Sequence, residues 1–239
     1  MIQGKNILIV GGSSGIGLAL AEHLSSQNTV YVASRSDKAV QHLAVHHIRY
    51  DATQEELDVS RLPEQLHGFI YCPGSINLRP FKGLKLEAFQ SDFEINVLGA
   101  VRSLKSVLGL LSASGDAAVV LYSTVAVQTG MPFHSSVASS KGAIEGLTRS
   151  LAAEFAPKIR VNAISPGPMR TLAGAAIGGA RKTFRTTEQN APLRSNASLE
   201  SVGGTAVYLS SDYGSDTTGE IIRVDGGYHV LGMAQPENL

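Results

Sequence analysis

A glycine-rich run early in the chain has the spacing of a phosphate-binding turn. The run Gly11-Gly12-Ser13-Ser14-Gly15-Ile16-Gly17 follows the apolar segment 7–10 and precedes apolar residues at helical spacing. Glycine allows positive φ and close approach of a ligand to the backbone, and the free N–H groups of a helix N-terminus attract phosphate. The pattern predicts a dinucleotide diphosphate here; a tight turn without a ligand is the alternative. The residues predicted to hold it are Gly11, Ser13, Ser14, Gly15, Ile16 and Gly17.

The end of the next apolar segment, 30–33, indicates which dinucleotide is bound. Ser34 and Arg35 follow it directly, and the nearest acid, Asp37, lies further on. Folds that select NAD place an acid here for the ribose 2′-hydroxyl, whereas an arginine accommodates the 2′-phosphate of NADP. We therefore predict NADP(H) as the preferred cofactor and NAD(H) as the less favoured one. The alternative is that Arg35 is a solvated surface charge.

A histidine and a lysine in the middle of the chain could take part in proton transfer. Hydride transfer to a held substrate is cofactor chemistry, but the protein must supply a proton or a donor for the developing oxyanion. His134 lies three residues before Val137 and seven before Lys141, so a helix would place all three on one face. An imidazole titrates close to neutral pH. The alternative is that His134 is an exposed loop residue.

Three hydroxyl groups near predicted strand ends are further candidates. Tyr122 ends the apolar segment 117–122, and Thr124 follows two residues later. Tyr71 ends a shorter strand-like segment. Thr124 can donate a hydrogen bond but is too weak an acid to protonate a substrate alone. Tyr122 and Tyr71 could instead serve only in core packing.

The segments that must position these groups alternate between strand-like and helix-like patterns. Apolar runs suited to strands buried on both faces cover 7–10, 30–33, 48–50, 69–71, 117–122, 159–164 and 220–224. Helical spacing covers 18–24, 89–111, 138–155 and the stretch from the N-cap Ser198 to about 210. This alternation predicts an α/β fold: a single Rossmann-type domain over residues 1–239, with a doubly wound parallel sheet of seven strands. The irregular segment 166–197 is predicted to be a lid over the carboxyl ends of the strands; a disordered surface insertion is the alternative.

Composition excludes several classes of function. The 239 residues include 20 basic and 20 acidic side chains, so nothing predicts a nucleic-acid partner. The single cysteine gives neither a disulfide nor a metal cluster, and no metal site is predicted. The apolar runs look too short to span a bilayer, and the first strand begins too early to leave room for a signal peptide. We therefore predict a cytoplasmic protein with no membrane partner.

The chain resembles the short-chain dehydrogenase/reductase family over essentially its whole length. The residues that carry the resemblance are Gly11, Gly15, Gly17, Asp51, Cys72-Pro73-Gly74, Asn96, Ser140-Lys141, the run from Pro166 to Thr171, and Asp225-Gly226-Gly227. The resemblance implies that Lys141 binds the nicotinamide ribose, that Asn96 holds a relay water, and that a homodimer or homotetramer forms through helices near 89–111 and 138–155. It also implies further cofactor contacts from Asp51, Ala52, Cys72, Pro73, Gly74, Pro166, Gly167, Met169 and Thr171.

Two positions depart from the family pattern. The tyrosine that exchanges the substrate proton is replaced by Val137, and the preceding serine by Thr124. The C-terminal third is similar to the enoyl-acyl-carrier-protein reductases in Gly167 to Ala173, Ala191 to Arg194 and Val224 to His229. That branch places its tyrosine seven residues before the lysine, where this chain has His134. The usual proton donor of either branch is therefore missing.

These observations leave three hypotheses. The first is an NADP(H)-dependent oxidoreductase that acts on a carbonyl or an activated C=C bond of a small-molecule or acyl-thioester substrate, with an atypical proton donor. Its predicted catalytic residues are Lys141, Thr124, His134, Asn96 and Tyr122. The second is a dinucleotide-binding sensor with little turnover, and the third is an oligomer partner for an active relative.

Overall fold

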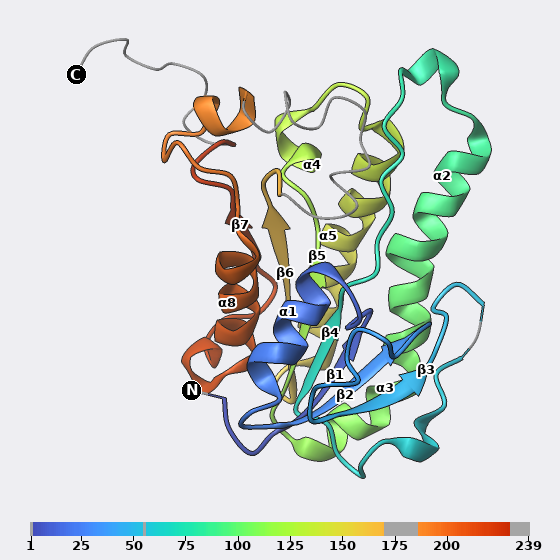
Figure 1. Cartoon of the computed structure of the whole chain (residues 1–239), viewed down its shortest axis with the longest axis vertical. Helices are drawn as coiled ribbons and strands as arrows, with labels where there is room; N and C mark the ends of the chain where they lie inside the picture. The colour runs from blue at the N-terminus through green and yellow to red at the C-terminus, as the bar shows by residue number, and fades with distance from the viewer. Residues whose placement is uncertain (1, 55, 170–185, 230–239) are drawn as a thin grey trace.

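Seven short apolar segments pair as parallel strands. The computed structural model describes residues 2–54, 56–169 and 186–229. The strands are β1 (Asn6–Val10), β2 (Thr29–Ser34), β3 (Val45–Arg49), β4 (Gly68–Tyr71), β5 (Ala117–Tyr122), β6 (Ile159–Pro166) and β7 (Ile221–Val224). They form one sheet in the order β3-β2-β1-β4-β5-β6-β7 (Figure 1). The predicted doubly wound parallel sheet of seven strands is confirmed.

The central strands are apolar without alternation because both faces of the sheet are covered. In β1, Leu8 and Val10 face one apolar cluster, while Ile7 and Ile9 face the other. All four side chains are at most 1% exposed. Burial of a strand on both sides therefore explains why its sequence reads as a continuous apolar run.

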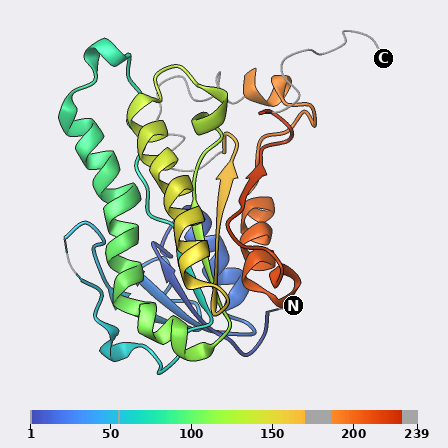
Figure 2. The same cartoon turned by 180° about the vertical axis from the view of Figure 1, so that it is seen from behind.

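Helices cover the two faces of the sheet. On one face α1 (Gly15–Leu24) packs beside α8 (Leu199–Ser210), and on the other lie α3 (Gly99–Ser114) and α5 (Ser135–Phe155) (Figures 1 and 2). Further described elements are α2 (Leu86–Phe93), the π-turn η3 (Glu94–Leu98), α4 (Ala126–Thr129), and the 3₁₀ turns η1 (Val59–Arg61), η2 (Phe81–Gly83) and η4 (Asp212–Gly214).

The helix predicted over 89–111 is longer than expected and is interrupted. Elements α2, η3 and α3 run on as one helical segment, Leu86–Ser114, of 29 residues. By length and composition this segment could cross a membrane, so the prediction that no segment is long and apolar enough was wrong. Within the fold, 44% of its most apolar window is buried, because the α3 part packs against the sheet. The π-turn in its middle is of a kind often found at functional sites.

The observed ends of two other helices can be compared with the predicted ends. Helix α5 begins at Ser135, three residues before the predicted start, and ends just before Pro157 as expected. The N-cap predicted at Ser198 is confirmed, because its hydroxyl accepts a 3.0 Å bond from the Ser201 amide.

The turn after β1 and the loop after β4 meet where the order of strands reverses. Strands β1 and β4 are neighbours although they are far apart in sequence. An ideal Cβ on Gly11 would lie 2.9 Å from Cδ of Pro73, so only glycine permits this approach. Ligands bind at such switch points, outside the carboxyl ends of parallel strands.

Candidate active site

The glycine-rich turn combines two positive φ values with an uncapped helix N-terminus. Gly11 and Gly15 adopt positive φ values of 77° and 54°. Ser14 is the N-cap of α1, and its side chain makes no capping hydrogen bond, so the cap leaves first-turn amides without a side-chain acceptor. Added Cβ atoms would collide at Gly12 with Val32, at 2.8 Å, and at Gly17 with the Gly11 carbonyl. The turn therefore packs its backbone closely against β2 and against itself, at the N-terminus of α1.

An exposed arginine follows the end of β2, and hydrogen bonds together with this arginine's charge lower the pKa of Asp51. Arg35 is exposed. The Ser34 hydroxyl is buried; it donates to the Ser36 carbonyl at 2.9 Å and lies 3.0 Å from Nε2 of His47. Of the two residues predicted to meet a 2′-phosphate, Arg35 is thus the one whose polar group faces solvent. His47 is a neighbour that sequence reasoning missed, because its contact depends on the β2–β3 register.

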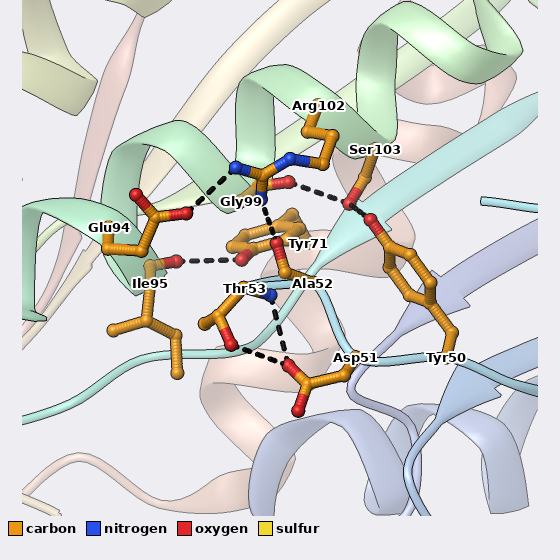
Figure 3. Close-up of polar contacts among 10 residues, drawn as sticks. All are labelled: Tyr50, Asp51, Ala52, Thr53, Tyr71, Glu94, Ile95, Gly99, Arg102 and Ser103. Atoms are coloured by element: carbon orange, nitrogen blue, oxygen red, sulfur yellow. Dashed lines mark hydrogen bonds and ion pairs between the residues drawn. The ribbon is translucent and has the colours of Figure 1, made fainter. Parts of the chain in front are cut away.

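The loop after β3 is held in one conformation by its own side chains. The Asp51 carboxylate accepts bonds from the amide and hydroxyl of Thr53, at 3.0 and 2.7 Å. These bonds hold the pKa of Asp51 below its usual value. The next carbonyl, that of Ala52, accepts a hydrogen bond from Arg102 of α3 (Figure 3).

The π-turn is joined to this loop and to β4 through polar contacts (Figure 3). Arg102 also forms a 2.8 Å ion pair with Glu94 at the start of the π-turn. The Tyr71 hydroxyl donates to the Ile95 carbonyl at 2.7 Å, and burial raises the pKa of that phenol far above its usual value. Tyr71 therefore ties the end of β4 to the residue that precedes Asn96.

Asn96 and Lys141 form the centre of the site, and both are buried. The amide of Asn96 donates to the Ser140 hydroxyl at 3.1 Å. The Lys141 ammonium donates to the Tyr122 carbonyl at 2.8 Å. A Cβ on the exposed Gly74 would lie 3.0 Å from Oδ1 of Asn96 and 3.6 Å from Nζ of Lys141. Gly74 therefore packs directly against these two polar groups, which lie just beneath the surface at this point.

Burial shifts the pKa values of Lys141 and of the neighbouring Cys72. Desolvation lowers the pKa of Lys141 to about 8, although Cys72 and Asp92 act in the opposite direction. Desolvation also raises the pKa of the Cys72 thiol to about 12, which the nearby Lys141 partly offsets. Near neutral pH the site therefore holds an ammonium and a neutral thiol.

A buried carboxylate that sequence reasoning missed links three segments around the centre. Asp92 of α2 accepts hydrogen bonds from the Ser75 hydroxyl at 2.5 Å, the Asn77 amide at 2.8 Å and the Ser136 hydroxyl at 2.7 Å. Its side chain is fully buried. The only sequence signal is its position four residues before Asn96, one helical turn away. Asp92 thus fixes the loop after β4 against the first turn of α5.

The other predicted donors are placed less favourably. The Tyr122 side chain packs in the cluster beneath α1 and α8, on the sheet face opposite α5, and its buried hydroxyl has no partner among the described residues. Burial raises its pKa well above the usual value. Only the Tyr122 carbonyl therefore reaches Lys141.

His134 and Thr124 lie at the edge of the site. His134 is the N-cap of α5, one residue before the helix begins, and its carbonyl accepts a 2.7 Å bond from the Ala138 amide. Its ring binds the Pro132 carbonyl at 2.7 Å. Thr124 is half-buried, and its Oγ1 accepts a long 3.4 Å bond from the Ala126 amide; no acceptor for its O–H is found among the described residues, so it can donate to a ligand. Val137 itself is buried.

The segment after β6 closes the far side of the site as far as it is described. A Cβ on Gly167, which follows Pro166, would lie 2.8 Å from Cβ of Asp225, so the segment packs tightly on the end of β7. Met169 packs against the α1–α8 cluster. Thr171 and most of the predicted lid lie outside the described residues. Within 2–54, 56–169 and 186–229, no group of three or more His, Cys, Asp or Glu side chains is arranged to hold a metal ion.

Comparison with known proteins agrees with this geometry. The family model described as "Enoyl-(Acyl carrier protein) reductase" matches residues 10–229. A Rhizobium meliloti (strain 1021) protein named enoyl-[acyl-carrier-protein] reductase [NADH] 2 is 35% identical over 71% of this chain, and the match spans 65% of that protein, less than two thirds of its length. The Aquifex aeolicus (strain VF5) enoyl-[acyl-carrier-protein] reductase [NADH] FabI is 28% identical over 98% of this chain and 94% of its own.

Solved structures show the same fold. A short-chain type dehydrogenase/reductase from Mycobacterium ulcerans has 27% sequence identity and a TM-score of 0.85, with 95% of this chain and 90% of that chain covered. The phosphate turn, the buried lysine and the sheet order thus occur together with a family match over most of the sequence. The chain belongs to the short-chain dehydrogenase/reductase family, in the group that the enoyl-(acyl carrier protein) reductase model describes.

Proposed function

We propose that this protein reduces the activated C=C bond of an enoyl thioester with a nicotinamide dinucleotide. One observation carries the proposal: a diphosphate cradle and a buried Lys141–Asn96 centre lie at the same carboxyl edge of the sheet. The names of the two enoyl reductases support the substrate class. A carbonyl substrate is the other member of the class that we predict from the sequence.

Residues along the carboxyl edge of the sheet would hold the successive parts of the cofactor. The turn from Gly11 to Gly17 would hold the diphosphate, the loop at Asp51 and Ala52 the adenine, and Lys141 the nicotinamide ribose. Cys72, Pro73, Pro166, Gly167 and Met169 would line the nicotinamide end, as the family resemblance implies. When bound, the nicotinamide supplies or accepts the hydride. Asn96 would hold a water beside Lys141, and Thr124 would donate a hydrogen bond to the developing oxyanion.

A turnover assay tests the proposal. Purified protein mixed with NADH or NADPH and a crotonyl thioester should consume the reduced cofactor, and a parallel panel of ketones tests the carbonyl alternative. Calorimetric binding of a dinucleotide without turnover on any substrate contradicts the proposal. That result supports the second candidate, a dinucleotide-binding sensor or oligomer partner, which the replacement of the family tyrosine by Val137 favours.

We further propose that Arg35 lets the site accept the 2′-phosphate of NADP(H), whereas the names of the related reductases support NAD(H). Arg35→Asp should weaken NADPH binding at least about tenfold, because a charge-assisted hydrogen bond to phosphate is lost. NADH affinity should change less than about threefold, since no group of NADH needs the guanidinium. Fluorescence titration measures both constants.

A matched charge reversal controls for the overall field. Lys38→Asp makes the same change of charge on an exposed residue three positions along, and we expect it to leave the ratio of the two affinities unchanged. If Arg35→Asp weakens both cofactors equally, Arg35 does not recognise the 2′-phosphate.

We also propose a single functional domain, a lid formed by about 166–197, and a homodimer or homotetramer formed through α2, α3 and α5. An open groove of about 460 Å³ between α2 and α5 supports the oligomer, because exposed Phe93 and Leu98 help to line it. The balanced charge and the single cysteine support a cytoplasmic location without a nucleic-acid or membrane partner.

A further inference from the structure

Reduction of an enoyl thioester needs a proton donor, and three of the candidate groups in the described chain are committed elsewhere. The Tyr122 phenol lies on the opposite sheet face, the Tyr71 phenol donates to a helix carbonyl, and the His134 ring binds the Pro132 carbonyl at the rim. An alcohol such as Thr124 is too weak an acid to replace them. The inference about the proton donor rests on the proposed function, because it assumes that the protein reduces an enoyl thioester.

Lys141 has the position that these groups lack. Its ammonium has three N–H donors, and the one protein acceptor in contact with it among the described residues is the Tyr122 carbonyl. That carbonyl lies two residues before Thr124, so the ammonium lies beside the segment that carries the predicted oxyanion donor. Gly74 is exposed, and an ideal Cβ on it would lie 3.6 Å from Nζ, so the ammonium lies directly beneath the surface at Gly74. A remaining N–H group can therefore point at a molecule held there.

We propose that Lys141 is itself the proton donor of the reaction, in addition to binding the ribose. Hydride adds to the β-carbon of the enoyl thioester, and the C=C electron pair moves to form an enolate whose oxygen the Thr124 hydroxyl can contact. An N–H bond of the Lys141 ammonium then breaks, and its proton joins the α-carbon. The cofactor is oxidised, the C=C bond is reduced, and the neutral amine regains its proton from solvent.

The groups around Lys141 suit this role. Cys72, from the loop after β4, stays a neutral thiol because burial raises its pKa to about 12. Asp92, from α2, favours the protonated amine, whereas burial of Lys141 disfavours it. Glu145, one turn further along α5, accepts a 2.7 Å bond from the Ser123 hydroxyl. The Tyr122 phenol of β5 points away. Lys141 is thus the group that titrates near pH 8, which suits a general acid near neutral pH.

The unsubstituted protein provides the first test. With saturating NADH or NADPH and a crotonyl thioester, kcat should fall as pH rises through about 8, because the required ammonium is lost. Asp92→Asn should move this fall to lower pH, since the negative charge that favours the ammonium is gone. Glu87→Gln, the same change on an exposed residue of α2, should leave the profile in place.

Substitution of the lysine gives the second test. Lys141→Arg keeps a cation and N–H donors for the ribose but cannot release a proton below about pH 12. It should lower kcat at least about 100-fold while the Kd for NADH stays within about threefold, because the proton transfer and not the binding is lost. Adding Val137→Tyr to this variant places a phenol one helical turn away. The double variant should have a kcat at least about tenfold higher than that of Lys141→Arg alone.

The outcomes separate this inference from the proposed function. A kcat that is flat from about pH 7 to 10, or retained in a folded Lys141→Arg variant, overturns the inference while the reductase assignment stands. An effect of Lys141→Arg confined to the KM for the cofactor shows a ribose-binding role alone and also overturns it. No turnover by the unsubstituted protein overturns the proposed function, and the inference fails with it.

Discussion

Replacing Gly17 with alanine should lower the affinity for NADH and NADPH at least about 100-fold, or about 2.7 kcal/mol. The added methyl group would press on the Gly11 carbonyl and lie 3.0 Å from Cα of Gly12. Both clashing groups belong to the backbone and cannot rotate away as the end of a flexible side chain could. The start of α1 must therefore move away from the turn. The first-turn amides then no longer meet the diphosphate. Isothermal calorimetry with each dinucleotide measures the loss.

A second glycine provides the control for helix propensity. Gly204 lies exposed in α8, and a Cβ there would meet nothing within 4 Å. Gly204→Ala should leave both affinities unchanged and raise thermal stability slightly, because alanine is the better helix former. If Gly17→Ala binds the dinucleotides as tightly as the unsubstituted protein, the turn does not hold the diphosphate.

Replacing Asp92 with alanine should lower the free energy of unfolding by about 3 kcal/mol, because the buried Ser136 hydroxyl and the half-buried Ser75 and Asn77 donors lose their acceptor, and a buried donor without one costs about 1–3 kcal/mol. The carboxylate accepts from Ser75, Asn77 and Ser136 and is fully buried. Loss of these bonds should also free the loop after β4, so kcat should fall along with stability. Chemical denaturation monitored by circular dichroism gives the free energy.

Two further substitutions in the same helix serve as controls for Asp92→Ala. Asp92→Asn keeps an oxygen acceptor for two of the three donors. It should lower the free energy of unfolding by less than half as much as Asp92→Ala does. Ser91→Ala changes the exposed neighbour, whose hydroxyl only donates back to the Ala88 carbonyl, and should leave the unfolding transition in place. If Asp92→Ala unfolds like the unsubstituted protein, Asp92 does not hold the three segments together.

The proton donor is the point at which this chain departs from its family pattern. A buried valine occupies the tyrosine position, while the lysine, the helix asparagine and the phosphate turn remain. A site that keeps its cofactor-binding parts and loses its phenol has two physical outcomes: another acid takes over, or turnover stops. Turnover by the unsubstituted protein distinguishes the two, and the pH profile of kcat then identifies the acid.

Local pattern determined the sheet and the cofactor turn. Burial on both faces makes a central parallel strand a continuous apolar run, so segments such as 7–10 and 117–122 were predicted and confirmed. The glycines at 11 and 15 signal positive φ, which is a local requirement of the turn. The Ser198 N-cap was also predictable, because its partner lies three residues away.

Contacts between segments that are distant in sequence could be identified only from the tertiary structure. The π-turn at Asn96 forms where Tyr71 and Arg102 bind its backbone and side chains, and no spacing within the helix encodes those partners. The bonds of Asp92 to Ser75 and Ser136 join segments 17 and 44 residues away. Which face of the sheet Tyr122 takes, and how deeply Lys141 is buried, depend on the packing of whole helices. Sequence thus determined the elements and the cofactor turn, whereas packing decided which side chains meet and with what pKa.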